Sequence, residues 1–124
     1  MPDIPADRRH KLPDTAKIPS NPLAFIKDCV GQGRLFWTYH VNMRLTSRKI
    51  GRAMIVGSVD TYETIEAYPG DKYLPSYLVF ARHENHVIHI LFATDVPGIN
   101  VRVVTAYRPD PREWEMDLKK RRAP

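Results

Sequence analysis

The sequence predicts a single α+β domain in which one or two N-terminal helices pack on a four-stranded antiparallel β-meander. Three observations lead to this prediction. Apolar residues recur with helical spacing over 38–56, four strand-like runs follow over 61–108, and turn residues separate those runs. The chain has 124 residues, the length of one domain, and such a chain can bury a core without disulfides or a metal.

The domain is expected to cover residues 23–118, between a proline-rich arm over 1–22 and a basic tail over 119–124. The arm holds five of the eleven prolines and almost no apolar periodicity, which favours an extended or flexible segment. The net charge of +5 lies mainly in the tail, because the body carries 11 basic and 11 acidic groups. A uniformly basic nucleic-acid-binding body is therefore not indicated.

The first helix is short and begins at Pro22, a favoured first position, with Ser20 or Asn21 as its cap. Gly31 marks its end. Cys29 lies on its apolar side and is the single cysteine of the chain. An intramolecular disulfide is thus excluded, and we expect Cys29 to be a small buried residue.

The second helical segment covers 38–56, with Thr38 as its cap and Gly51 as a point where it can divide into two helices. Strand-like runs rich in β-branched and aromatic residues follow over 61–68, 76–82, 86–94 and 101–108. A short closing helix is predicted over 112–120, where Trp114 and Leu118 supply the apolar side chains. The basic tail over 119–124 is predicted to be exposed to solvent.

Charge is unevenly distributed along the body. Residues 29–59 contain five basic side chains and no acid, whereas residues 60–71 contain four acidic side chains and no base. One interpretation is a solvated basic face that pairs with a neighbouring acidic strand. The other is a local anion-binding site on an otherwise neutral protein.

His40 and Arg44 are four residues apart in the second helical segment, so their side chains leave from one face. A histidine can transfer protons near neutral pH, and an arginine beside it can hold a phosphate and stabilise charge that builds on it. Arg48 continues the stripe by one turn, and Arg52 by another. The spacing by itself also fits an ordinary solvated helix face.

Three further histidines, His83, His86 and His89, are spaced three apart, as metal ligands can be. They fall on a predicted hairpin, however, and a two-residue turn would pair His83 with His86 and place His89 on the other face. The three rings would then not converge on a metal. In this register Arg82 and His89 are diagonal neighbours and form a second basic pair.

Tyr107 lies near the end of the last strand, where a tyrosine usually packs its ring and leaves its hydroxyl wet. The functional alternative is a phenol that donates to a phosphate, or a ring that stacks on a nucleobase. Arg82 and Arg52 are, with Arg48, the candidates for phosphate binding.

Several function classes have no support. The sequence lacks a P-loop, a dinucleotide-binding glycine motif, a zincin motif and a serine-hydrolase elbow. We therefore expect no bound cofactor and no metal. The N-terminus has no apolar signal region and no run of about 18 apolar residues exists, so the expected location is the cytoplasm of a bacterium.

Five strings resemble, in order and spacing, a bacterial domain family of unknown function: Trp37–Ile50, Glu63–Pro69, Pro75–Arg82, His89–Ala93 and Val103–Trp114. The shared pattern is H-x-x-x-R-x-x-x-R on a helix, a strand with a central histidine, and T-x-Y-x-P-D-P near the end. The positions that match it are His40, Arg44, Arg48, His89, Tyr107, Pro109 and Asp110. The family typically has Arg-Gly-Ile where this chain has Arg48-Lys49-Ile50, so Gly51 is expected to take the break in the helix.

The resemblance implies a fold similar to the barnase–EndoU–colicin–RelE group. Members of the family look like small relatives of RelE-like and BrnT-like ribonuclease toxins, and are often encoded beside a YgiT/MqsA-type zinc-finger antitoxin. It implies a metal-independent endoribonuclease in which His40 and His89 share the acid and base roles. Arg44 would stabilise the transition state, and Tyr107 would orient the phosphate or stack on a base.

Two alternatives remain open at this stage. The first is a non-catalytic RNA- or protein-binding module of the same fold, which the neutral charge of the body favours. The second is a metal-dependent hydrolase built on His83, His86 and His89. An antiparallel meander also leaves two edge strands through which a homo-oligomer can form.

Overall fold

A computed structural model describes residues 18–123 of the chain, so most of the predicted arm over 1–22 lies outside the described residues. Helix α2 (Pro22–Gly31) begins as expected: Pro22 is at its first position, and the amide of Ala24 donates to the side chain of Asn21 (3.1 Å). This contact satisfies an amide that the helix cannot pair internally. Cys29 is buried, as predicted.

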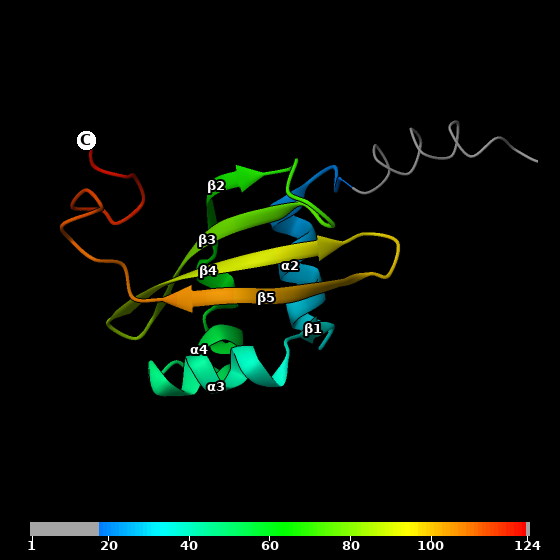
Figure 1. Cartoon of the computed structure of the whole chain (residues 1–124), viewed down its shortest axis with the longest axis horizontal. Helices are drawn as coiled ribbons and strands as arrows, with labels where there is room; N and C mark the ends of the chain where they lie inside the picture. Colours follow the sequence, from blue (N-terminus) through cyan, green and yellow to red (C-terminus); the bar gives the residue numbers. More distant parts are fainter. Residues whose placement is uncertain (1–17, 124) are drawn as a thin grey trace, which may run out of the picture.

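The protein is α+β, as predicted, but its sheet has five strands and is mixed (Figure 1). The order is β1-β5-β4-β3-β2. The predicted four-stranded meander consists of β2 (Glu63–Tyr68), β3 (Ser76–His83), β4 (His86–Asp95) and β5 (Asn100–Tyr107). The expectation of a purely antiparallel sheet was wrong, because β1 (Leu35–Phe36) pairs parallel to β5. Two residues are too few to show a strand periodicity.

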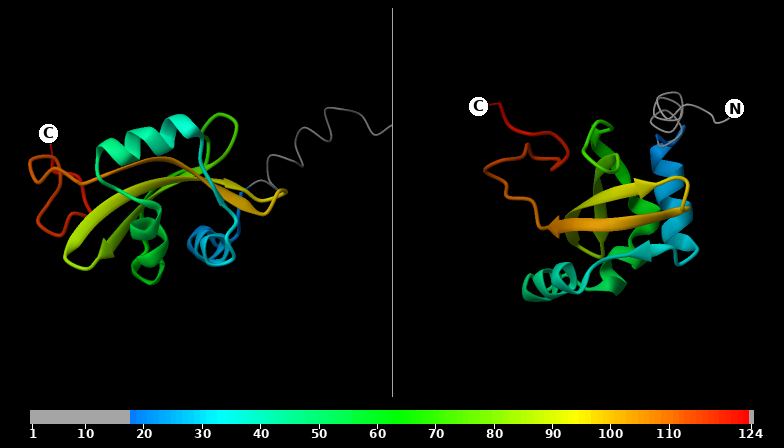
Figure 2. Two further views of the ribbon diagram at one scale, coloured as in Figure 1. Left: turned by 90° about the horizontal axis from the view of Figure 1, so that it is seen from below. Right: turned by 45° about the vertical axis from the view of Figure 1, so that its right-hand side comes forward.

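Helices lie on both faces of the sheet (Figure 2). Helices α2 and α4 (Arg52–Gly57) cover one face, where the main core forms. Helix α3 (Tyr39–Ser47) lies on the other side, along β5. The largest fully buried side chains of the main core include Ile26, Ile55, Tyr62, Val79, Ile90 and Phe92.

The predicted division of the second helical segment is confirmed: the helix is interrupted between α3 and α4, and Gly51 is the extended N-cap residue of α4. Lys49 adopts a left-handed conformation (φ 59°) just after α3. The amide of Ile50 donates to the carbonyl of Leu45, and that of Lys49 to the carbonyl of Thr46 (both 2.9 Å). This pattern closes a helix end around a left-handed residue, usually glycine. Here a lysine stands at the position that glycine usually occupies.

Replacing Lys49 by glycine is therefore expected to raise the free energy of unfolding by about 0.5–1 kcal/mol, because glycine adopts this conformation without steric cost. Urea denaturation measures the change. Lys49→Ala is the control, since it removes the charge but keeps the strained backbone. A Lys49→Gly protein no more stable than Lys49→Ala would contradict the explanation.

The predicted closing helix over 112–120 is absent. Residues 109–123, called here the C-terminal segment, form turns instead, closed by a bridge between Trp114 and Arg121. The carboxylates of Asp110 and Asp117 accept from the amides of Arg112 and Lys119, each two residues on. Such local bonds compete with helical ones. Leu118 also has a positive φ (60°), which no helix permits.

Candidate functional site

Helix α3 presents His40 and Arg44 side by side at the surface. Thr38 begins the helix by accepting from the amide of Val41 (3.1 Å), and the four-residue spacing then stacks the two side chains. Arg44 Nη2 lies 3.0 Å from His40 Nε2, and both residues are exposed. Because a guanidinium only donates, His40 Nε2 must accept, which places the ring proton on Nδ1. The predicted pair is therefore an assembled unit in the structure.

Arg48 attaches the same helix to the sheet. Its Nη1 donates to Thr105 Oγ1 (3.1 Å) and to the carbonyl of Ala106 (2.7 Å) on β5. Arg108 donates in return to the carbonyls of Arg48 and Lys49, at the end of α3. A cation at a helix C-terminus also interacts favourably with the helix dipole. These bonds hold the basic stripe of α3 beside the end of β5, where Tyr107 lies.

The basic stripe of α3, which consists of Arg44 and Arg48, has no acidic partner among residues 18–123. Within residues 18–123, no carboxylate lies within ion-pair distance of Arg44, Arg48 or Arg52. The acidic strand β2 and helix α3 lie at opposite edges of the sheet, so the interpretation in which they pair is wrong. No acidic side chain described by the structure therefore neutralises the charge of α3, and such a charge attracts anions.

His89 is completely buried, in contrast to His40. It pairs with Tyr107 across β4 and β5, and the Tyr107 hydroxyl lies 3.3 Å from His89 Nδ1. His89 Nε2 lies 2.6 Å from the carbonyl of Leu118, which can only accept, so Nε2 carries a proton. The Trp114 ring lies edge-on to the imidazole at 4.4 Å. His89 therefore has no access to solvent in this conformation.

Burial determines the protonation states of His89 and Tyr107. Loss of water lowers the pKa of His89, and the Leu118 carbonyl only partly opposes the change. Burial also raises the pKa of the Tyr107 hydroxyl. At neutral pH both groups are therefore uncharged, and Tyr107 can donate to His89 Nδ1.

The lowered pKa of His89 predicts a pH dependence of stability. The unfolded chain binds a proton to this histidine near its ordinary pKa of about 6.5, whereas the folded protein binds it only at lower pH. The free energy of unfolding should therefore fall as the pH drops below about 6.5, by up to about 1.4 kcal/mol per pH unit.

Urea denaturation between pH 7.5 and 5.5 measures this slope. We expect His89→Gln to flatten it, while His86→Gln, at an exposed position on the same strand, keeps the slope of the parent. The quantity compared is the slope of the free energy of unfolding against pH, and not the free energy itself, because His89→Gln is expected to destabilise the fold at every pH. Equal slopes for the parent and His89→Gln would contradict the account.

The C-terminal segment covers His89 and is held there by ion pairs to β2. Arg121 donates twice to the Glu66 carboxylate (2.7 and 3.2 Å), and Lys119 pairs with Glu63 (2.9 Å). Although partial burial raises the pKa of Glu66, hydrogen bonds from Arg121 and Tyr68 outweigh it and lower that pKa. The expectation of a solvated basic tail was thus wrong for Lys119 and Arg121.

Sequence reasoning did not find this contact between β2 and the C-terminal segment. Glu63 and Glu66 are three residues apart, which in a regular strand places them on opposite faces. A bulge between Thr64 and Glu66 shifts the register, so that Glu63 lies opposite Phe80 and Glu66 opposite Leu78. The sequence carries no signal for that bulge.

The remaining predicted residues lie apart from the α3 stripe. Arg52, on α4, stacks over the Trp37 ring at 5.3 Å. Arg82 is exposed near the end of β3, with its guanidinium over Phe80 at 5.8 Å. No hydrogen bond or ion pair within residues 18–123 joins the His40–Arg44 pair to His89.

The predicted register of the β3–β4 hairpin is confirmed. His83 pairs with His86, and Phe80 pairs with His89, which places His89 and Arg82 on one face. The three histidines therefore do not converge. In the part of the chain from 18 to 123, no three metal-ligating side chains form a cluster. None of the helices described there is long and apolar enough to cross a membrane.

The chain matches a known protein family. The family described as "Domain of unknown function (DUF4258)" matches residues 37–108, which run from Trp37, just before α3, to the end of β5. The match includes His40, Arg44, Arg48, His89 and Tyr107, and ends where the C-terminal segment begins. Searches among curated proteins and among solved structures found no match. The chain belongs to the DUF4258 family.

Proposed function

We propose that the protein is a metal-independent endoribonuclease that acts at the exposed edge formed by α3. The observation that carries the proposal is the solvent-exposed contact between His40 and Arg44, at the head of a basic stripe that has no acidic partner within the described part of the chain. The implied chemistry is attack of a ribose 2′-hydroxyl on the neighbouring phosphate. The resemblance to ribonuclease toxins supports the same reading.

The two side chains have complementary roles in this reaction. In the structure, Arg44 Nη2 donates to His40 Nε2. A phosphate that binds the Arg44 guanidinium would compete for this N–H donor and release His40 Nε2. The freed nitrogen can then accept the proton of the 2′-hydroxyl, while Arg44 stabilises the negative charge that grows on the phosphate. Arg48, one turn further along, extends the anion-binding edge toward Tyr107.

His89 takes a different role from the one predicted. As a buried residue beneath Trp114 it cannot meet RNA unless the C-terminal segment moves away. We therefore assign acid–base chemistry to His40 and a structural role to His89, which ties β4, β5 and the C-terminal segment together. Protonation of the leaving 5′-oxygen falls to water or to the Tyr107 hydroxyl.

The test is RNA cleavage in EDTA by the parent protein, His40→Ala and His86→Ala, all purified identically. His86 is a matched control because it is also an exposed histidine, on the β3–β4 hairpin. We expect a loss of rate of about 100-fold or more for His40→Ala alone. Equal rates for all three proteins would refute the assignment.

The alternative function is a non-catalytic RNA- or protein-binding module. The burial of His89 favours it, because one exposed histidine at the α3 edge is half of the acid–base pair that such cleavage ordinarily uses. This alternative predicts salt-dependent RNA binding by the parent without turnover.

The resemblance also supports a toxin-like role with a YgiT/MqsA-type zinc-finger antitoxin as partner. The outer edges of β1 and β2 are the positions at which a partner chain or a second copy could extend the sheet. Co-expression with the product of the neighbouring gene, followed by size-exclusion chromatography, tests both interactions.

A further inference from the structure

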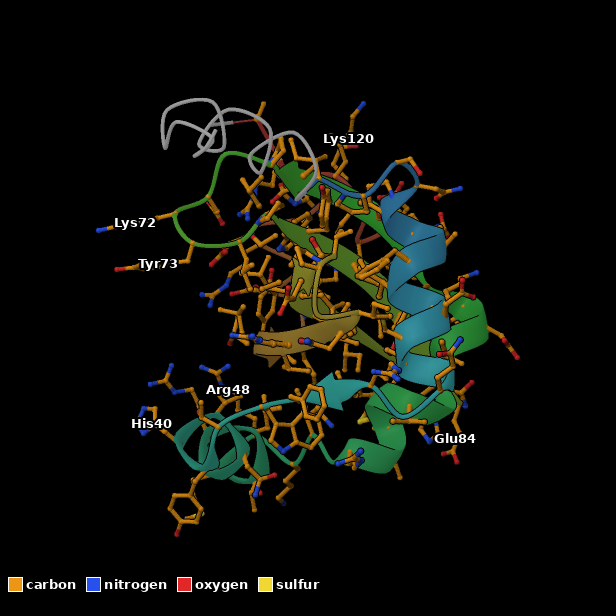
Figure 3. The ribbon with its side chains drawn as sticks, turned by 90° about the vertical axis from the view of Figure 1, so that its right-hand side faces the viewer. His40, Arg48, Lys72, Tyr73, Glu84 and Lys120 are labelled. Atoms are coloured by element: carbon orange, nitrogen blue, oxygen red, sulfur yellow. The ribbon has the colours of Figure 1, made fainter. Side chains whose placement is uncertain are left out.

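A groove of about 570 Å³ opens on the same side of the sheet as α3, separate from the His40–Arg44 pair. Its walls are the loop between β2 and β3 and the start of α3, and its floor is the open face of β4 and β5. Figure 3 shows Lys72 and Tyr73 on the same side of the molecule as His40 and Arg48, across the sheet from α2. The groove therefore lies next to the proposed cleavage edge.

The floor of this groove is apolar, and an exposed aromatic ring stands at its rim. Leu91, Ala93 and Val104 supply the floor, and Leu74 adds an apolar side chain from the wall. Tyr73 is 82% exposed, and Lys72 Nζ lies 5.2 Å from the centre of its ring. An aromatic ring beside an apolar surface is the arrangement on which single-stranded bases stack.

Basic and acidic side chains alternate at the groove, and further basic side chains follow on α3. Lys72 and Arg102 are both exposed groove residues. Two carboxylates offset these two charges: Asp95 forms an ion pair with Arg102 (3.2 Å), and Asp71, which accepts from the Ser76 hydroxyl, is the neighbour of Lys72 in the chain. Arg44 and Arg48 add two further positive charges on the neighbouring helix. The positive charge in excess, which attracts a polyanion, therefore comes from Arg44 and Arg48.

We propose that this groove is a nucleotide-binding subsite for single-stranded RNA. One base stacks on Tyr73 against the apolar floor, and the adjoining phosphates lie against Lys72 and Arg102. The strand then runs on to the His40–Arg44 edge. The subsite rests on the proposed function, since it supplies the substrate strand to that edge, and it assigns single-stranded rather than duplex RNA as the substrate.

The experiment measures the affinity for a short fluorescein-labelled RNA whose 2′-hydroxyls are all methylated, so that it cannot be cleaved. We expect Tyr73→Ala to weaken binding by about 5- to 100-fold, the range for loss of one stacked base. Tyr73→Phe should bind like the parent, because stacking needs the ring and not the hydroxyl.

Salt dependence tests the phosphate contact. We expect Lys72→Ala to reduce the slope of log affinity against log salt by about 0.7, the value for one lost phosphate contact on a single strand. Lys27→Ala is the charge control, since Lys27 lies on α2, on the opposite face of the sheet.

The outcomes separate the subsite from the proposed function. If the parent binds and cleaves RNA but Tyr73→Ala and Lys72→Ala bind as tightly as the parent, the subsite is refuted and the proposed function stands. If the parent binds no RNA, both fail. Equal affinity for the single strand and for its duplex would also overturn the subsite, because a paired base cannot stack on Tyr73.

Discussion

Replacement of Trp114 by alanine is expected to lower the free energy of unfolding by about 3–5 kcal/mol, the usual cost of removing a buried tryptophan. Trp114 is 1% exposed and packs its ring against the His89 imidazole at 4.4 Å. The Arg121 guanidinium lies over the Trp114 ring, 4.5 Å from the ring centre. Its loss would leave a cavity and weaken every contact that holds the C-terminal segment.

Urea denaturation measures this effect, with Met116→Ala as the matched control. Met116 lies in the same segment but is 95% exposed, so its truncation should change stability by less than about 0.5 kcal/mol. A change of less than about 1 kcal/mol for Trp114→Ala would mean that the C-terminal segment contributes little to folding. His89 would then have to be regarded as accessible to substrate.

Replacement of Arg44 by alanine is expected to reduce the rate of RNA cleavage by about 100- to 1,000-fold, the cost of losing one donor to a developing negative charge. Affinity for uncleavable RNA should fall far less, because one phosphate contact among several is lost. Arg44→Lys should restore only part of the rate, since an ammonium cannot present the planar fork of a guanidinium.

Arg34→Ala is the control for the loss of positive charge. Arg34 is also exposed, but it lies before β1 and away from α3. Cleavage rates and equilibrium binding are measured separately for each variant. Equal losses of rate and affinity in Arg44→Ala would show that Arg44 only binds RNA, and an unchanged rate would remove it from the site.

Several features of the fold could be predicted because each depends on residues that are close together in the sequence. The caps at Asn21 and Thr38, the pairing of His83 with His86, and the contact of His40 with Arg44 each depend on residues within four positions. Side-chain chemistry and helical or hairpin geometry are sufficient to specify such features.

The features that were missed depend on distant parts of the chain. Strand β1 exists because Leu35 meets Val101, and the burial of His89 depends on a segment that begins twenty residues later. Alternation along β4 placed His89 on the less covered face of the sheet. Only the folded chain brings Trp114 over that face, and this buries a histidine that the sequence predicts to be catalytic.

The central claim is that His40 promotes cleavage of RNA by the substrate's own 2′-hydroxyl, without a metal. The most direct test determines the ends of the products formed from labelled RNA in EDTA. The account predicts 2′,3′-cyclic phosphate and 5′-hydroxyl ends from the parent and from His86→Ala, and no such products from His40→Ala. Products with 3′-hydroxyl ends, or the same cyclic phosphates from His40→Ala at the parent's rate, would contradict it.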